Sequence, residues 1–71
     1  MARRLISTTG NEVFTAKVYR DAEWNEYRVR FYHFDDLMED ADYHTNDKDD
    51  AIASSQAAVR QMTANWQARF A

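Results

Sequence analysis

Two histidines and a run of acidic residues are the side chains that could do acid–base or metal chemistry in this chain. The histidines are His33 and His44, and eight Asp and Glu residues lie within residues 35–50. Imidazoles and carboxylates act as general acids and bases, and they ligate zinc and calcium. The chain has no cysteine, no Gly-rich phosphate loop and no motif around a nucleophilic serine. We therefore expect a protein that is not an enzyme, with both histidines at the surface.

Asp40, Asp42 and His44 alternate along the chain and come closest to a set of metal ligands. An EF-hand calcium loop needs a turn glycine and a distal glutamate at fixed positions, and this segment has neither. The acids of residues 47–50 suit the first turn of a helix, where the helix dipole favours negative charge. We therefore predict no metal site and no cofactor.

Negative charge is concentrated in the middle of the chain. Residues 35–50 carry eight acids against Lys48 alone, whereas residues 1–34 carry six basic and four acidic groups. Carboxylates at regular spacing could imitate a phosphate backbone and occupy the basic surface of another protein. The alternative is that they form solvated turns and a helix start. The candidate docking residues of this acidic segment are Asp35, Asp36, Glu39, Asp40 and Asp42.

Two runs with a period of two residues predict a β-hairpin. Val13–Tyr19 has its apolar residues at even positions, and Tyr27–Phe31 has them at odd positions. A shared apolar face then sets an antiparallel register, with the turn over Asp21–Trp24. The predicted cross-strand pairs are Val18 with Tyr27, Ala16 with Val29, and Phe14 with Phe31.

Further strands are predicted on both sides of this hairpin. Arg4–Thr8 is a candidate strand that ends before a turn at Gly10, where a positive φ would be tolerated. After the hairpin, Asp35–Met38 is predicted as a turn. Glu39–Thr45 alternates Ala41 and Tyr43 with polar residues and is predicted as an edge strand.

The last third of the chain has the period of a helix. Apolar residues recur every three or four positions from Lys48 to Phe70, and Thr45 or Asn46 is the expected N-cap. The positions that face inward in this helix are Ile52, Ser55, Val59, Met62, Trp66 and Phe70.

The order of predicted elements gives one α+β domain over residues 1–71, a three- to four-stranded antiparallel sheet packed against one long C-terminal helix (β-β-β-β-α). This order is similar to that of the sheet-plus-helix DNA-binding modules at the N-termini of some integrases, and more loosely to the double-stranded-RNA-binding domain. The similarity is one of topology, which does not carry function with it. The expected core residues are Phe14, Val18, Val29 and Phe31 from the hairpin, and Ile52, Val59 and Met62 from the helix.

The outer face of the predicted sheet combines positive charge with aromatic rings and could bind nucleic acid. The register places Lys17 opposite Arg28 and Thr15 opposite Arg30. However, the edge strand would bring Asp40, Asp42 and His44 onto the same face, and a pI of about 5.2 opposes phosphate at long range. We expect no tight nucleic-acid binding. The candidate residues for this alternative are Lys17, Tyr19, Arg28, Arg30 and Tyr32.

The end of the helix is the strongest candidate for a docking site. A helix over residues 48–70 would be about 35 Å long, whereas strands of eight residues span only about 26 Å. The overhanging turns carry Trp66, Arg69 and Phe70, and large aromatic groups commonly anchor interfaces. The alternative is that the helix crosses the sheet diagonally, so that both rings cover the open end of the core.

These features favour a small non-enzymatic protein-binding module. Compact chains of this kind are common among phage-encoded modulators and inhibitors of host proteins. The alternatives are a nucleic-acid-binding module and a structural subunit of a homo-oligomer such as a homodimer, because so short a chain without cysteine gains no stability from disulfides. Residues 1–7 resemble neither a signal peptide nor a membrane span, so we expect a cytoplasmic protein with no membrane partner and no small-molecule substrate.

Overall fold

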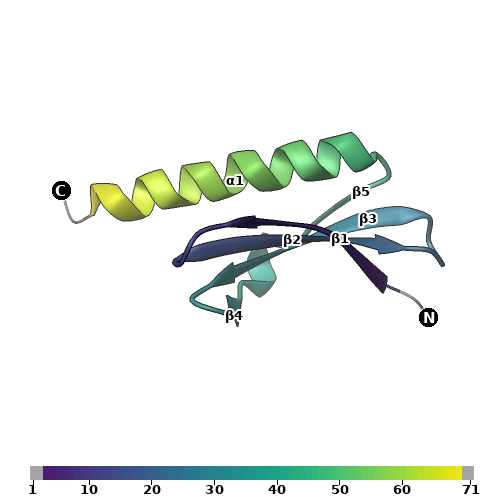
Figure 1. Ribbon diagram of the computed structural model, residues 1–71, viewed down its shortest axis with the longest axis horizontal. Helices are drawn as coiled ribbons and strands as arrows, with labels where there is room; N and C mark the ends of the chain where they lie inside the picture. The colour runs from purple at the N-terminus through teal and green to yellow at the C-terminus, as the bar shows by residue number, and fades with distance from the viewer. Residues whose placement is uncertain (1–2, 70–71) are drawn as a thin grey trace.

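The computed structural model describes residues 3–69 and shows an antiparallel sheet with one helix across one of its faces (Figure 1). The sheet has five strands in the order β1-β2-β3-β4, and the short β5 also pairs with β3. This confirms the predicted α+β fold. The elements are β1 (Arg3–Gly10), β2 (Phe14–Asp21), β3 (Glu26–His33), β4 (Asp36–Leu37), the 3₁₀ helix η1 (Glu39–Ala41), β5 (Tyr43–Thr45) and α1 (Lys48–Ala68).

The β2–β3 hairpin forms as predicted, but its register is two residues away from the predicted one. Val18 pairs with Val29, Ala16 with Phe31, and Phe14 with His33. A shift of two residues leaves each side chain on the same face of the sheet, so the apolar face is preserved. The new partner of Phe14 is therefore His33, which lies on the helix side and is half-buried. The prediction that His33 is a surface residue was wrong.

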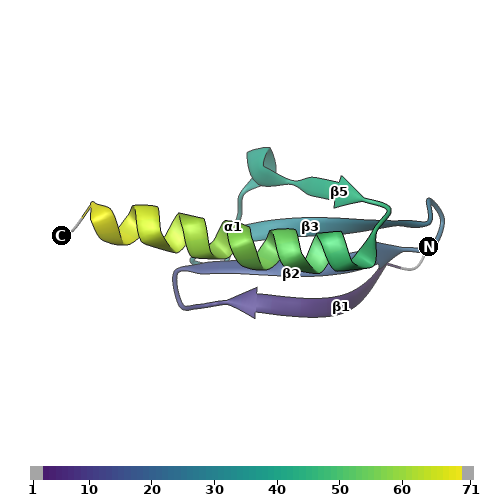
Figure 2. The same cartoon turned by 90° about the horizontal axis from the view of Figure 1, so that it is seen from above.

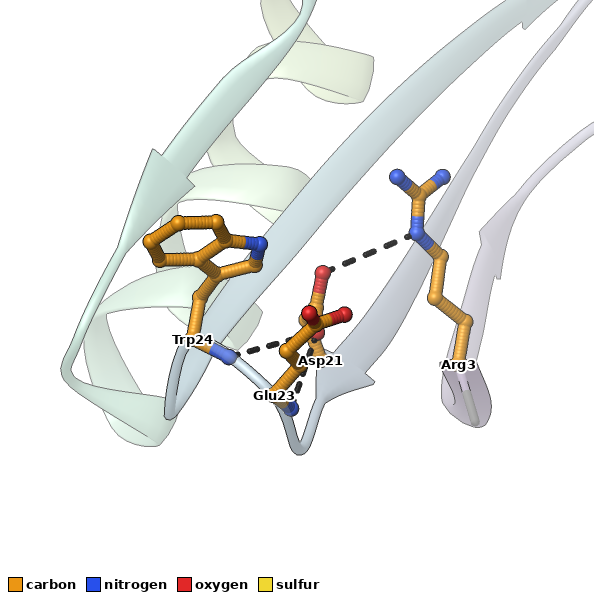
Figure 3. A network of polar contacts seen from close by, with 4 residues as sticks. All are labelled: Arg3, Asp21, Glu23 and Trp24. Atoms are coloured by element: carbon orange, nitrogen blue, oxygen red, sulfur yellow. Dashed lines mark hydrogen bonds and ion pairs between the residues drawn. The ribbon is translucent and has the colours of Figure 1, made fainter. Parts of the chain in front are cut away.

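The length of the β2–β3 loop explains this shift. The predicted register leaves two residues in the turn, whereas the observed loop, Ala22–Asn25, has four. Asp21 Oδ1 accepts hydrogen bonds from the backbone N–H groups of Glu23 (3.1 Å) and Trp24 (3.4 Å), as Figure 3 shows. Asn25 closes the loop with a φ of 51°, a conformation that asparagine tolerates well.

The β1–β2 turn depends on Gly10, whose φ is 140°. A Cβ atom at this position would collide with the backbone carbonyl oxygen of Phe14. Asn11 completes the turn because its side-chain oxygen accepts from the N–H groups of Val13 (2.9 Å) and Phe14 (3.0 Å). Its side-chain nitrogen donates to Thr63 Oγ1 (2.8 Å) and so ties this turn to α1. Earlier in β1, a β-bulge interrupts the pairing between Leu5 and Ser7.

The segment after β3 differs most from the prediction. The turn lies one residue earlier than expected, at Phe34 and Asp35, whose φ values of 50° and 71° are those of a type I′ hairpin turn. Residues 36 and 37 then form β4 instead of continuing the turn. The predicted strand Glu39–Thr45 is only half correct, since η1 occupies its first part and only β5 pairs with β3. This detour brings Met38 and Ala41 against the core, which explains why η1 replaces a straight strand.

The core lies between α1 and the helix-facing side of β2 and β3 (Figures 1 and 2). The predicted burial of Phe14, Val18, Val29, Phe31 and Val59 is confirmed. The helix is rotated slightly from its predicted orientation, so Ala51 and Ser55 are fully buried, while Ile52 and Met62 are only half-buried. The buried Ser55 hydroxyl donates to the carbonyl oxygen of Ile52 (2.7 Å), so its polar atom is satisfied within the helix.

The helix begins at Lys48, as predicted, but its N-cap lies one residue after Asn46, the later of the two predicted caps. Asp47 is the N-cap, and its Oδ1 accepts from the N–H groups of Asp49 (3.0 Å) and Asp50 (3.3 Å). Asp49 and Asp50 lie in the first turn, where they complement the helix dipole as expected. Within residues 3–69, no helix is both long enough and apolar enough to cross a membrane.

Truncating Val29 tests this register. We expect Val29→Ala to lower the free energy of unfolding by about 2–4 kcal/mol, because it removes methyl groups from a fully packed site. The exposed Leu37→Ala is the control, for which we expect a change within about 0.5 kcal/mol. Urea unfolding followed by circular dichroism measures both. Equal stabilities of Val29→Ala and wild type would contradict the placement of Val29 in the core.

Candidate functional site

The C-terminal turns of α1 extend beyond the end of the sheet at the β1–β2 turn (Figures 1 and 2). The Asn11–Thr63 hydrogen bond marks where the helix leaves the sheet. The next turn carries Trp66, and Arg69 follows at the helix C-cap. Phe70, the third residue predicted for this site, lies outside the described residues.

Trp66 does not stand free on this overhang. Its indole is half-buried and lies edge-on against the rings of Phe14 (6.1 Å between centroids), His33 (4.9 Å) and Phe34 (5.8 Å). The imidazole of His33 is in turn stacked on Phe14, with centroids 4.8 Å apart and planes inclined by 14°. Trp66 therefore covers the open end of the core. This was the alternative to an indole that stands free on the overhang.

An apolar hollow of about 260 Å³ lies beside this indole. Its lining combines aromatic rings with two methionines, and most of these side chains are half-buried. Methionine adapts to differently shaped apolar groups, and aromatic anchors recur at protein interfaces. The residues that line this end hollow are Phe14, His33, Met38, Met62, Asn65, Trp66 and Arg69.

Phe34 stands next to the end hollow and was not predicted to be part of a site. Its ring is 55% exposed, and it contacts His33 with ring centroids 4.8 Å apart. The φ of 50° is a conformation that a large side chain rarely adopts, and type I′ turns favour Asn or Gly at this position. Strained backbone of this kind is concentrated at functional sites. The one signal in the sequence was a phenylalanine directly before the polar pair Asp35 and Asp36, at the start of the predicted turn.

Arg69 supplies the charge at the edge of the end hollow. It is exposed, and within residues 3–69 no carboxylate forms an ion pair with it. The hollow therefore combines an apolar floor with a cation that is available to an incoming carboxylate.

The residues of the acidic segment are exposed and follow the edge of the sheet next to β3. Asp35 lies in the hairpin turn, Asp36 in β4, and Glu39 and Asp40 in η1, with Asp42 directly after it. The 3₁₀ turn removes the regular alternation on which the phosphate-mimic hypothesis depended. Among the described residues, no three His, Asp or Glu side chains gather closely enough to hold a metal ion.

The five residues of the nucleic-acid alternative do share the sheet face that α1 leaves open. With the observed register, Tyr19 pairs with Arg28, Lys17 with Arg30, and Thr15 with Tyr32. Lys17 Nζ lies 5.0 Å from the centroid of the Tyr32 ring, in a cation–π contact. Burial, together with the neighbouring Tyr32 hydroxyl, raises the pKa of Tyr19.

The expected neutralisation of this face is not observed. In the part of the chain that the structure describes, the one ion pair joins Arg3 Nε and Asp21 Oδ2 at 3.9 Å. Asp40 and Asp42 form none with Arg28 or Arg30, because η1 replaces the strand that would have aligned them. Only the exposed His44 lies directly opposite Arg28.

Among residues 3–69, Trp24 is the most exposed large apolar side chain, at 72%. It lies in the β2–β3 loop (Figure 3), and this loop is at the end of the molecule away from the C-terminal turns of α1 (Figure 2). Asp21 Oδ1 accepts a hydrogen bond from the backbone N–H of Trp24 (3.4 Å), which fixes the backbone of this loop. The prediction placed Trp24 in a turn but gave it no role, although tryptophan is unusual among the Gly, Asn and Asp of turns.

Comparisons with protein-family models, with curated proteins and with solved structures find no match to this chain. The similarity in element order to integrase modules therefore remains one of topology alone.

A tyrosine–carboxylate hydrogen bond connects β5 to the start of α1 and predicts a pH dependence. Tyr43 donates to Asp50 Oδ2 (2.6 Å), and this bond lowers the pKa of Asp50. A lowered pKa means that the contribution to stability is present at neutral pH and is lost as the pH falls from the ordinary aspartate range through the lower pKa that Asp50 has in the folded protein.

We expect Tyr43→Phe to be less stable than wild type at pH 7 and the difference to shrink as the pH is lowered. Thermal unfolding between pH 7 and pH 3 measures this difference. Tyr27→Phe is the control, because within residues 3–69 the Tyr27 hydroxyl has no hydrogen bond to a carboxylate, whereas the Tyr43 hydroxyl donates to Asp50. A constant difference between Tyr43→Phe and wild type across this range would show that the bond does not depend on the Asp50 charge.

Proposed function

We propose that this chain is a non-enzymatic binding module that docks another protein at the end hollow beside Trp66. The observation that supports this most directly is the combination of methionines and aromatic rings around a concave apolar surface of about 260 Å³. A concave apolar surface of this composition suits one large side chain of a partner, in the manner of an interface anchor.

The chemistry of the lining indicates the partner. The floor formed by Met38 and Met62 fits an apolar side chain of varied shape, whereas Arg69 at the edge favours a carboxylate beside it. The expected ligand is therefore a protein segment with an apolar anchor next to an acidic residue. A phage-type modulator or inhibitor of a host protein would act in this way, by occupying such a segment of its target.

Phe34 is the residue whose replacement best separates docking from folding. Phe34→Asn removes an exposed ring and replaces it with a residue that tolerates positive φ. The relief of backbone strain offsets the lost ring contacts, so we expect the free energy of unfolding to change by no more than about 1 kcal/mol. Partner affinity should fall roughly thirtyfold, which corresponds to an aromatic anchor of about 2 kcal/mol.

Capture of partners from a host lysate on immobilised protein, followed by titration of the captured partner, measures this effect. Trp24→Ala is the matched control, since it removes another exposed aromatic ring at the opposite end of the molecule. Retention of partners by Phe34→Asn together with their loss from Trp24→Ala would transfer the docking site to the β2–β3 loop. Sedimentation of the protein alone tests the alternative of a homo-oligomer, for which the partner is a second copy of this chain.

A second candidate function is nucleic-acid binding by the outer sheet face. The observation that favours it is that Arg28 and Arg30 have no ion pair within residues 3–69. Lys17 and Arg30 lie directly opposite each other, and an anionic ligand would relieve the repulsion between their like charges. The net charge of −3 opposes long-range attraction of phosphate, which places this candidate second.

The variant Arg28→Gln/Arg30→Gln tests this second candidate. We expect wild type to bind labelled oligonucleotides no more tightly than roughly micromolar at ~0.15 M salt, because few phosphates can be neutralised. Fluorescence anisotropy measures the affinity, and Arg60→Gln on α1 is the control for loss of charge. Submicromolar wild-type binding that disappears in the double variant but persists in Arg60→Gln would make nucleic-acid binding the leading function.

A further inference from the structure

A second hollow, of about 540 Å³, lies between the start of α1 and the end of the sheet that carries the β2–β3 loop, where β1 begins and β2 ends. It is separate from the end hollow and shares no lining residue with it. Three of its side chains are cationic, and the part of the lining between them is apolar or aromatic. The cations are Arg4, Arg20 and Lys48, and the apolar or aromatic part includes Ile6, Ala22 and Tyr27.

The pairing of three strands brings two of these cations together. Arg4 on β1 pairs with Arg20 on β2, and Arg20 pairs with Tyr27 on β3, so the three side chains form one row across the sheet. Arg20 lies two positions after the buried Val18, which places the row on the helix side of the sheet. Lys48, the first residue of α1, lines the same hollow from the side of the helix.

The positive charges around this hollow are not neutralised by carboxylates of the described residues. Two arginines directly opposite each other in an antiparallel pair repel each other. Within residues 3–69, none of the three cations forms an ion pair, and no carboxylate lines the hollow. Arg20 Nη2 donates a hydrogen bond of 3.4 Å to Asn25 Oδ1, a neutral acceptor that leaves the charge of the guanidinium uncompensated.

We propose that this hollow binds the phosphate group of a small phosphorylated molecule. Guanidinium groups match phosphate oxygens in paired hydrogen bonds. Three cations fit a phosphate monoester, with a charge of about −1.5 to −2, better than a carboxylate with a charge of −1. The volume lies within the range of about 300–1,000 Å³ that is usual for small-ligand sites.

The apolar part of the lining accommodates the remainder of the ligand. Ile6 and Tyr27 are half-buried and pack against the core, so they form a fixed wall, and Ala22 leaves space at the start of the β2–β3 loop. An aromatic or apolar moiety attached to the phosphate would lie against this wall. The proposal extends beyond the sequence-based expectation, which was that the protein has no small-molecule substrate and no cofactor. It is independent of protein docking at the end hollow.

Titration of the full chain with adenosine monophosphate, followed by amide NMR shifts, tests the proposal. We expect shifts at Arg4, Arg20 and Lys48, and binding at least about tenfold tighter than that of adenosine, which lacks the phosphate. Inorganic phosphate should shift the same amides more weakly, because it does not contact the apolar wall. Absence of any shift at about 10 mM of either phosphate compound would overturn the proposal.

Matched charge variants then locate the site. We expect Arg20→Gln to weaken binding of adenosine monophosphate roughly tenfold and to leave the protein at least as stable, because it also removes the repulsion with Arg4. Arg60→Gln has the same change of charge at a distant exposed site and should alter binding less than about twofold. Equal weakening by both variants would show that only the overall charge matters. Oligothymidine binding that is tighter than mononucleotide binding and is lost in Arg28→Gln/Arg30→Gln would assign phosphate recognition to the outer sheet face, and the proposal would be wrong.

Discussion

The close approach of α1 to the sheet is the constraint on which the rest of the structure depends. Ala51 and Ser55, one turn apart, are fully buried, and Ala51 belongs to one cluster with Val18 and Val29. Because their side chains are small, the helix backbone can lie close to the strands, and larger side chains are needed only further along the helix. The Ser55 hydroxyl bonds within its own helix, so a polar group in the centre of the core leaves no unsatisfied donor.

Both hollows follow from how a straight helix covers a smaller sheet. At its C-terminal end, α1 continues past the sheet, and Trp66 closes the core there only with the help of His33 and Phe34. At its N-terminal end, the row of Arg4 and Arg20 lies just beyond the buried part of the strands. The two ends therefore differ in character, one apolar and one cationic, although the same helix borders both.

The period of the sequence predicted the hairpin, the long helix and most of the core, because each depends on local alternation of apolar and polar residues. The register could not be predicted, since it depends on how Asp21 bonds to the loop that follows it. The course after β3 was missed for a similar reason: a phenylalanine in a left-handed turn contradicts ordinary turn preferences. Trp66 and Arg69 were predicted as site residues, but their neighbours Met38 and His33 come from segments whose positions only the tertiary fold defines.

The β-bulge in β1 has a consequence for the solubility of the sheet. β1 is the one long strand with an open side, whereas the other side of the sheet is bordered by β4 and β5. An unpaired strand edge invites pairing with another chain, and bulges and charged residues are the usual protection against it. Here the irregularity between Leu5 and Ser7 interrupts the edge, and Arg3 and Arg4 add charge at its start. Protection of this kind disfavours open-ended aggregation of sheets. Binding to other molecules then takes place through side-chain surfaces and not through the backbone of the strand edge.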